Sequence, residues 1–261
     1  MIKYLIRAGL IASLFINTDV FAQGPPITAD KPIMLGAKTI VLRTLTEVRE
    51  TDIGTFTRVP LMFHYLTTAN SLVAIHVPYV NASFKGEANR EDLSGLGDIQ
   101  FLGKYQFYTK NAIGKTHRIS VKTIQVLPTG EEINIRRISA GTYQSYVGIV
   151  SGYETLKYGI STEVGYNLMP DRNQDEFRTK LGFGLPLLKP KFPVRQVNLY
   201  FEYTGNWLVE QDAREILYAQ GVQYARGRMT FEAALKWPIS QTIDRIERRK
   251  YSLLLGTRLI F

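Results

Sequence analysis

The stretch that most constrains the fold is Ser94–Tyr108, which alternates polar and apolar residues from Asp98 onward. A period of two residues sustained over eleven positions predicts a β-strand. The apolar face is rich in aromatic side chains, whereas the opposite face is polar at nearly every position. Such a strand either lines the core of a soluble sheet or turns its apolar face toward lipid in a membrane barrel. One face carries Ile99, Phe101, Gly103, Tyr105 and Phe107, and the other carries Asp98, Gln100, Lys104 and Gln106.

Residues 1–22 have the features of a secretory signal peptide. Lys3 and Arg7 give a basic start, and the run Gly9–Ile16 is mostly apolar. That run is too short to span a bilayer as a helix, and no other stretch reaches about 18 apolar residues. We therefore expect a cleaved signal, export of the remaining chain and a location in the bacterial outer membrane, which the chain would cross as strands.

The other end, Lys250–Phe261, predicts a closing strand with a mostly apolar face and an aromatic last residue. This ending resembles the C-terminal assembly signal of bacterial outer-membrane barrels, which implies the barrel-assembly machinery as a partner. The apolar face carries Tyr251, Leu253, Leu255, Thr257 and Leu259.

The amino-acid composition excludes several classes of functional site. The chain has no cysteine, so disulfides, a thiol nucleophile and a thiolate metal site are excluded. Its 15 tyrosines and 13 phenylalanines suit the aromatic girdles of a membrane barrel. The formal net charge is +9, but the basic residues are scattered instead of forming one run. We therefore expect outer-membrane lipid and lipopolysaccharide as surroundings, and no nucleic acid partner.

Alternation like that of Ser94–Tyr108 recurs along the chain and predicts about twelve strands joined by alternately long, charged and short connections. Residues 23–35, which contain three prolines, have no period and predict an extended N-terminal tail. Residues 36–261 predict an all-β, antiparallel, up-and-down transmembrane barrel. The expected strands are residues 36–48, 58–66, 71–80, 94–108, 117–127, 142–153, 158–168, 177–187, 197–207, 215–224, 229–237 and 250–261.

Two features favour the membrane barrel over a soluble β-sandwich. Aromatic residues stand near the ends of outward faces, where a membrane interface would lie. Small residues on the opposite faces suit a crowded or curved lumen. The aromatic residues are Tyr65, Tyr79, Tyr158, Phe177 and Trp207. The small residues are Gly165, Gly182, Gly184 and Gly256.

Several short blocks in the first half of the exported chain are similar to a known family. They are His64-Tyr65-Leu66-Thr67, Val77-Pro78-Tyr79-Val80, Gly95-Leu96-Gly97-Asp98, Lys104-Tyr105 and Leu127-Pro128-Thr129-Gly130. In order and spacing these blocks resemble the outer-membrane barrels associated with the meta pathway of phenol degradation. The chain departs at Leu66, where the family usually has glycine. The resemblance implies a porin-like barrel that carries hydrophobic or aromatic compounds, and it supplies no catalytic residue or cofactor.

The alternation also predicts which charged side chains line the lumen. With Arg43, Lys250, Glu47 and Asp98 added, the inward set has nine basic and five acidic members, which favours an anion-preferring lumen. The alternative is that these charges pair across strands and fill a closed interior. The candidate lumen-lining residues are Lys104, Arg118, Lys122, Glu163, Arg178, Lys180, Glu202, Glu232, Lys236 and Arg258.

The preferred hypothesis is a monomeric outer-membrane channel or uptake conduit for small aromatic or anionic compounds by passive diffusion. Its gates would be the loops Asn81–Leu93 and Thr129–Gly141. One alternative is a barrel-embedded lipid-modifying enzyme, which would need a histidine base. Another is a closed structural or adhesive barrel that acts through its external loops. We expect His64 and His76 to be polar filler on adjacent inward faces, and His117 to be interfacial; no serine lies in a nucleophile-elbow motif.

Overall fold

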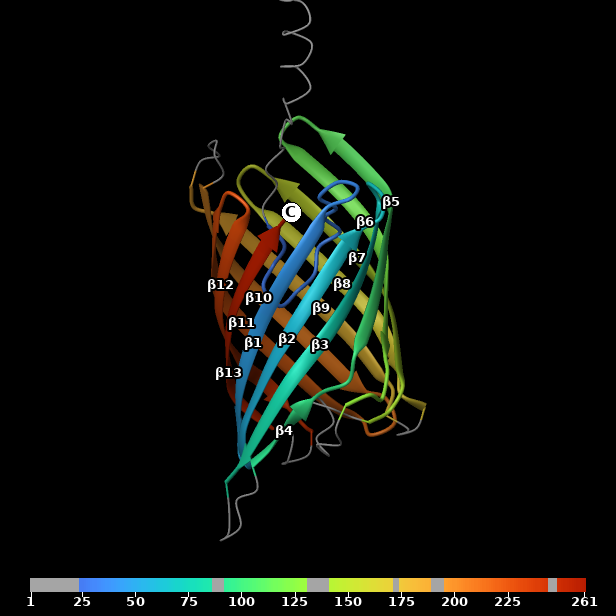
Figure 1. Cartoon of the computed structure of the whole chain (residues 1–261). Coiled ribbons are helices and arrows are strands. Elements are labelled where there is room, and N and C mark those ends of the chain that lie inside the picture. Colours follow the sequence, from blue (N-terminus) through green and yellow to red (C-terminus); the bar gives the residue numbers. More distant parts are fainter. Residues whose placement is uncertain (1–23, 86–91, 131–140, 171–173, 189–194, 244–247) are drawn as a thin grey trace, which may run out of the picture.

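The computed structural model describes residues 24–85, 92–130, 141–170, 174–188, 195–243 and 248–261, which form one closed β-barrel (Figure 1). The expected signal peptide, residues 1–22, lies outside these ranges, as does much of the two predicted gating loops. Within the described residues, no helix is long and apolar enough to cross a membrane.

Thirteen strand segments make up the barrel. They are β1 (Ile40–Thr51), β2 (Gly54–Leu66), β3 (Ser71–Phe84), β4 (Asp92–Leu96), β5 (Gln100–Ala112), β6 (Lys115–Val126), β7 (Gln144–Thr155), β8 (Gly159–Leu168), β9 (Glu176–Pro186), β10 (Arg195–Leu208), β11 (Ala213–Arg226), β12 (Met229–Gln241) and β13 (Arg249–Ile260). Neighbouring strands pair antiparallel throughout, and β1 pairs with both β2 and β13, which closes the sheet.

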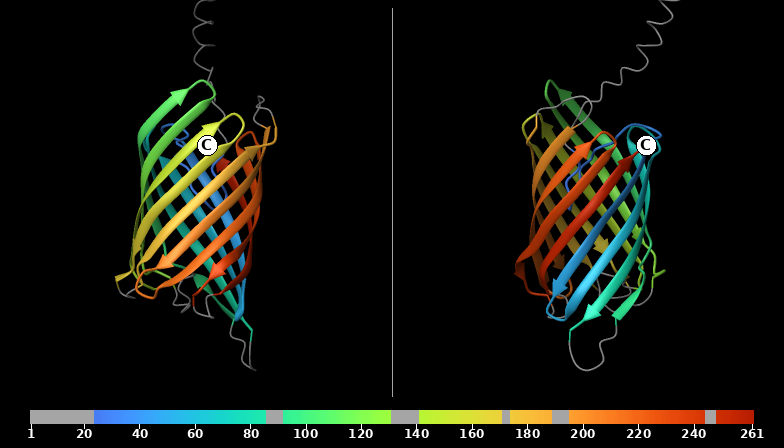
Figure 2. Two further views of the ribbon diagram at one scale, coloured as in Figure 1. Left: turned by 180° about the vertical axis from the view of Figure 1, so that it is seen from behind. Right: turned by 60° about the vertical axis from the view of Figure 1, so that its left-hand side comes forward.

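The segments β4 and β5 are two parts of a single stave. Strand β4 pairs with residues 79–83 of β3, and β5 pairs with residues 71–76 of the same strand. The barrel therefore has twelve staves, as the alternation predicted. The start of β1 and the end of β13 lie at the same end of the barrel (Figures 1 and 2).

The long connection expected after the first strand is instead a two-residue turn, because both flanking strands extend further than their alternation indicated. The Thr51 hydroxyl accepts a hydrogen bond from the Gly54 backbone N–H at 3.1 Å and donates one to the Gly54 carbonyl at 2.9 Å. A side chain at Gly54 would meet the Ser83 carbonyl oxygen at 2.2 Å, so only glycine fits there. Strand β3 likewise continues to Phe84, into the predicted loop Asn81–Leu93.

The two faces of the sheet have the polarity of a membrane barrel. On β5, the outward side chains of Phe101, Tyr105 and Phe107 are 46%, 53% and 55% exposed. On the inner face, by contrast, Glu163 and Glu202 are each only 1% exposed. An apolar exterior around a charged interior is the arrangement that lipid requires and the reverse of a soluble sandwich.

Aromatic side chains pack against one another between neighbouring staves. The rings of Phe177 and Trp207 have centroids 5.7 Å apart, and those of Tyr158 and Phe183 are 6.1 Å apart. Tyr79 is 48% exposed on the outer face. These contacts include Tyr158, Phe177 and Trp207, which the alternation places on outward faces.

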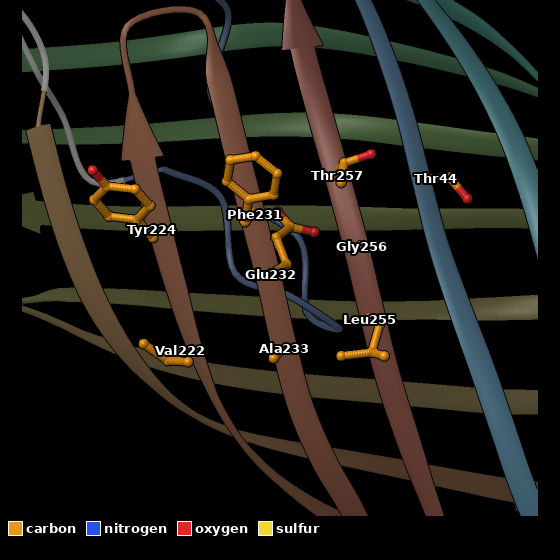
Figure 3. A pocket seen from close by; sticks show the side chains of 9 residues that line it. All are labelled: Thr44, Val222, Tyr224, Phe231, Glu232, Ala233, Leu255, Gly256 and Thr257. Atoms are coloured by element: carbon orange, nitrogen blue, oxygen red, sulfur yellow. The ribbon is translucent and has the colours of Figure 1, made fainter.

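The outer surface also has an apolar groove of about 430 Å³ across β11, β12 and β13 (Figure 3). The small side chain of Ala233 stands in register between Val222 and Leu255, and the Phe231 ring borders the gap. The groove is lined mostly by outward side chains, and the inward residues Glu232 and Gly256 contribute to its floor.

Candidate functional site

The lumen contains residues 24–35, which we call the plug. The segment that the sequence indicated as an extended tail thus runs inside the barrel, where Ile27 and Lys31 are each 2% exposed. Gly36 and Lys38, with φ angles of 105° and 64°, then turn the chain out of the lumen and into β1. The protein's own chain consequently occupies part of the lumen.

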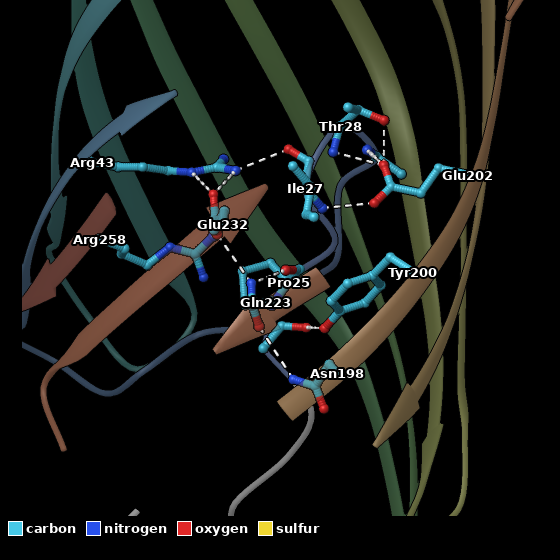
Figure 4. Close-up of polar contacts among 12 residues, drawn as sticks. Pro25, Ile27, Thr28, Arg43, Asn198, Tyr200, Glu202, Gln223, Glu232 and Arg258 are labelled. Atoms are coloured by element: carbon cyan, nitrogen blue, oxygen red, sulfur yellow. Dashed lines mark hydrogen bonds and ion pairs between the residues drawn. The ribbon is translucent and has the colours of Figure 1, made fainter. Parts of the chain in front are cut away.

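A single carboxylate holds the tip of the plug. Glu202 of β10 accepts hydrogen bonds from the backbone N–H groups of Ile27, Thr28 and Ala29, at 2.7, 2.6 and 2.6 Å, and from the Thr28 hydroxyl (Figure 4). Three successive N–H groups directed at one anion form a backbone nest. Because the acceptor is charged and buried, these hydrogen bonds are stronger than neutral ones.

An arginine pair holds the opposite side of the plug. Arg43 donates to the Ile27 carbonyl at 2.9 Å and also pairs with Glu232 at 2.7 Å. Arg258 donates to the other oxygen of Glu232 at 2.5 Å (Figure 4). Two cations therefore share one buried carboxylate, and one of them is also bonded to the plug.

Neutral hydrogen bonds fix the first residues of the plug. The Tyr200 hydroxyl donates to the Gly24 carbonyl at 2.5 Å. The Gln223 amide donates to the Pro25 carbonyl at 3.1 Å (Figure 4). Backbone carbonyls of a segment without strand partners are thereby satisfied by side chains of the wall.

The plug also carries two charged side chains with wall partners. Asp30 lies 2.6 Å from Lys104 Nζ and 3.1 Å from Lys122 Nζ. Lys31 pairs with Glu154 at 3.0 Å. Burial alone would raise the pKa of Asp30, but the positive charges of Lys104 and Lys122 hold it well below its ordinary value. Asp30 is therefore an anion in the docked plug.

Glycines in the wall provide the space that the plug occupies. A side chain at Gly152 would come within 2.7 Å of Pro32, and no wall atom is among its near contacts. A side chain at Gly182 would meet Ala29 at 3.2 Å and Pro26 at 3.3 Å, in addition to Ser161. Small residues at these inward positions thus serve the plug and not only the curvature of the sheet.

Gly152→Leu is expected to displace the plug without altering any charge. The new side chain collides with Pro32, and overpacking of this kind costs about 1–3 kcal/mol, or roughly a 5- to 150-fold rise in the undocked fraction. Because the chain has no cysteine, maleimide labelling of an introduced Ile27→Cys reports undocking without background. The matched control is Gly103→Leu on the outward face of β5, which should leave labelling unchanged. Equal labelling rates in both variants would contradict the packing role of Gly152.

Beyond the plug tip lies a polar cavity of about 290 Å³, which we call the vestibule. Thr28 of the plug lines it on one side, and side chains from staves all around the barrel line the rest. Its charged lining has an excess of positive charge. The basic members are Arg49, Arg58, Arg178, Lys180, Lys236 and Arg249, and the acidic members are Asp98 and Glu176.

The lumen-lining residues predicted from the sequence fall into two groups in the structure, one around the plug and one lining the vestibule. Those around the plug are Lys104, Lys122, Glu163, Glu202, Glu232 and Arg258. Those lining the vestibule are Arg178, Lys180 and Lys236. Arg118 is half-buried beside Gly152 and is not brought to either group. Paired charges and surplus cations therefore coexist in the same lumen.

Several pairs show how the wall charges are compensated. Lys122 pairs with Glu163, and Lys180 lies 3.9 Å from the same carboxylate. Lys236 and Arg249 both contact Glu47, at 2.9 and 2.7 Å. Arg49 also lies 3.6 Å from Glu47, and Arg249 lies 3.6 Å from a second acid, Glu215. Glu163 and Glu47 are thus each shared by more than one cation.

At three charged residues the structure differs from the expectation. Lys250, expected to face inward, is exposed and lies 3.3 Å from Asp52. Arg249, expected in the preceding loop, is 4% exposed and faces the lumen. The cause is an irregularity in β1–β13 pairing between Glu50 and Thr51, which shifts the facing at the start of β13. Glu154 falls between the expected strands 142–153 and 158–168, whereas β7 continues through it with its inward alternation.

The three histidines lie at two separate places in the barrel. His64 and His76 lie with their Nε2 atoms 3.2 Å apart, and they satisfy each other by one N–H···N hydrogen bond. No group of three or more metal-ligating side chains occurs in the described ranges. His117 Nε2 lies 3.1 Å from the Ser151 hydroxyl between β6 and β7. A serine and a histidine without an orienting third group do not make a triad, and no hydrogen bond to such a group is seen for His117 within the described residues.

No family model matches the chain, and no curated protein matches it. Among solved structures, it is similar to the KdgM porin in complex with disordered oligogalacturonate, at 8% identity and a TM-score of 0.54, covering 85% of this chain and 99% of that one. It is also similar to Pseudomonas aeruginosa OprD, at 8% identity and a TM-score of 0.40, covering 93% of this chain and 99% of that one. A third similar structure is outer membrane phospholipase A from Escherichia coli, at 10% identity and a TM-score of 0.46, covering 84% of this chain and 89% of that one.

At these identities the comparisons show the fold alone, and of these three matches the one to KdgM has a TM-score above 0.5. That fold is the outer-membrane β-barrel predicted from the alternation and the aromatic outer faces. The association with phenol degradation stays a prediction from the sequence blocks.

Proposed function

We propose that this protein is an outer-membrane conduit for small anionic solutes, closed at rest by its own plug. The observation that carries the proposal is the vestibule, where six cations face two carboxylates directly beneath the plug tip. An enclosed site with one dominant sign of charge and low-dielectric walls concentrates ions of the opposite sign. Passage would be passive diffusion, gated by displacement of the plug.

The vestibule also offers surfaces suited to an aromatic anion. Arg178 lies 5.2 Å from the centre of the Tyr146 ring, and the apolar side chains of Val126 and Leu217 line the same cavity. A guanidinium group binds carboxylates through two parallel hydrogen bonds, and apolar walls accept a ring. Aromatic and aliphatic anions are therefore both candidate solutes.

The proposal includes the surroundings implied by the fold. The protein would lie in the bacterial outer membrane, contact lipid and lipopolysaccharide, and function as a monomer. Its last strand, β13, pairs with β1 and would be the segment that the barrel-assembly machinery receives. No cofactor is required, because diffusion needs only the lumen and its charges.

Liposome-swelling assays with size-matched sugars test the charge preference. Glucuronate, glucose and glucosamine share the pyranose ring and differ mainly in charge, and the vestibule should favour glucuronate over glucosamine by about threefold or more. Neutralising Arg178→Gln and Lys236→Gln together should abolish most of that preference. Lys250→Gln is the matched control, because Lys250 is exposed outside the lumen. Benzenesulfonate measures whether an aromatic anion enters as well as glucuronate.

Two outcomes would contradict the proposal. Equal fluxes of the three sugars would show that the vestibule charges do not select solutes by their charge. A folded barrel that stays impermeable to all three after plug removal would instead favour a closed structural barrel, which the plugged lumen also suits. The oligogalacturonate of the KdgM structure, a polymer of acidic sugars, makes a sugar acid a natural first probe.

A further inference from the structure

We propose that Lys104 and Lys122 form a carboxylate-binding site in the lumen, which Asp30 of the plug occupies as an internal ligand. When the plug is displaced, the carboxylate of a solute takes the place of Asp30. The inference rests on the proposed function and names the chemical class that the conduit recognises.

The wall presents the two lysines as a matched pair. Lys104 of β5 and Lys122 of β6 are direct cross-strand partners in the sheet register. Both face the lumen, where their side chains are 9% and 4% exposed. Like charges placed directly opposite each other destabilise a sheet unless an anion lies between them. The pair is thus built around a negative ligand.

Asp30 fills that position with both of its oxygens. Oδ1 accepts from Lys104 Nζ at 2.6 Å, and Oδ2 accepts from Lys122 Nζ at 3.1 Å. Lys104 Nζ also donates to the Lys31 carbonyl at 3.2 Å, so both of its acceptors seen in the described structure belong to the plug. Displacing the plug removes them together.

The remaining wall charges cannot replace Asp30. Glu163 already pairs with Lys122 and lies 3.9 Å from Lys180. Without Asp30, Lys104, Lys122 and Lys180 would share that single carboxylate. A buried cluster with surplus positive charge takes up an anion because uncompensated buried charge is costly.

The site is also continuous with the vestibule. Lys180 lines the vestibule and donates to the Thr28 carbonyl of the plug at 3.3 Å. A carboxylate entering from the vestibule would meet Lys180 first and then reach the pair that Asp30 vacates. Solute and plug therefore compete for the same lysines.

Replacing Asp30 by alanine tests the site directly, with formate and acetate as probes. Asp30→Ala should lower the thermal unfolding midpoint, and saturating formate or acetate should raise it again by about 2–4 °C relative to sodium chloride of equal ionic strength. Adding Lys104→Gln should abolish the rise. Asp52→Ala, which removes an acid that pairs on the outside with Lys250, is the matched control and should show no carboxylate-specific rise.

A second measurement uses the intact Asp30 and therefore does not depend on that variant folding. Acetate should increase maleimide labelling of Ile27→Cys at least about twofold over chloride, because it competes with Asp30 for the docked state. The proposal would be overturned if acetate left the labelling rate unchanged. It would also be overturned if carboxylates still raised the thermal unfolding midpoint when Asp30→Ala is combined with Lys104→Gln.

Both readouts are independent of conduction. Loss of the carboxylate effects with intact anion-selective flux would reject this site and keep the conduit. Carboxylate binding in a barrel that never conducts would reject the conduit and keep the site.

Discussion

Excision of residues 24–35 should raise the single-channel conductance by about tenfold or more, because conduction requires an open aqueous path and the plug now occupies it. The wall should survive the excision, since β1 remains paired to both β2 and β13. Conductance would be recorded in a planar bilayer, and retention of the barrel would be checked by its heat-dependent shift in gel mobility.

A second variant tests whether the specific contacts of the plug, and not only the presence of a chain in the lumen, keep the barrel closed. Replacing residues 24–35 with a glycine–serine segment of equal length keeps the chain but removes the contacts with Glu202, Arg43 and Lys104. We expect this variant to conduct nearly as well as the excised one. If both variants assembled correctly and stayed closed, the plug would not be the barrier.

Glu202→Gln should loosen the plug more than any other single substitution that preserves side-chain shape. A neutral amide oxygen cannot satisfy three backbone N–H groups as the carboxylate does, and weakening these charged hydrogen bonds should cost about 2–4 kcal/mol of docking free energy. The undocked fraction would then increase roughly 30- to 900-fold. Maleimide labelling of Ile27→Cys measures that fraction.

Glu210→Gln is the control for loss of one negative charge, because Glu210 is exposed between β10 and β11. It should label at the rate of the parent chain. An unchanged rate in Glu202→Gln would show that the nest around Ile27, Thr28 and Ala29 does not hold the plug.

The fold was predictable because its signal is local. In a barrel each strand must present one face to lipid and one to the lumen, so every stave repeats the period of two seen in Ser94–Tyr108. The same alternation put Lys104, Lys122 and Glu202 on inward faces. Residue facing is therefore readable from a few neighbours in the sequence.

The plug was not predictable in this way. Its residues have no periodicity, and the contact between Thr28 and Glu202 spans 174 positions in the sequence. A proline-rich segment without a pattern looks the same whether it lies in solvent or inside a barrel. The inward Gly182 is a partial signal in the sequence, but the space it leaves is explained only by Ala29 and Pro26 of the plug beside it.

Irregularities in strand pairing limited what the sequence could predict about which way individual residues face. The irregularity opposite the start of β13 exchanges the roles of Arg249 and Lys250, and alternation counted back from Phe261 cannot reveal it. Arg58 shares an alternation face of β2 with His64 and lines the vestibule. Its inclusion in the vestibule lining increases the positive excess that the sequence had already indicated.

The most direct test of the central claim is the reversal potential of the refolded protein in a planar bilayer under a potassium chloride gradient, measured with and without residues 24–35. We expect rare openings for the plugged chain, frequent openings for the excised chain, and chloride preference in both. Potassium preference, or no selectivity in an open excised barrel, would contradict an anion conduit.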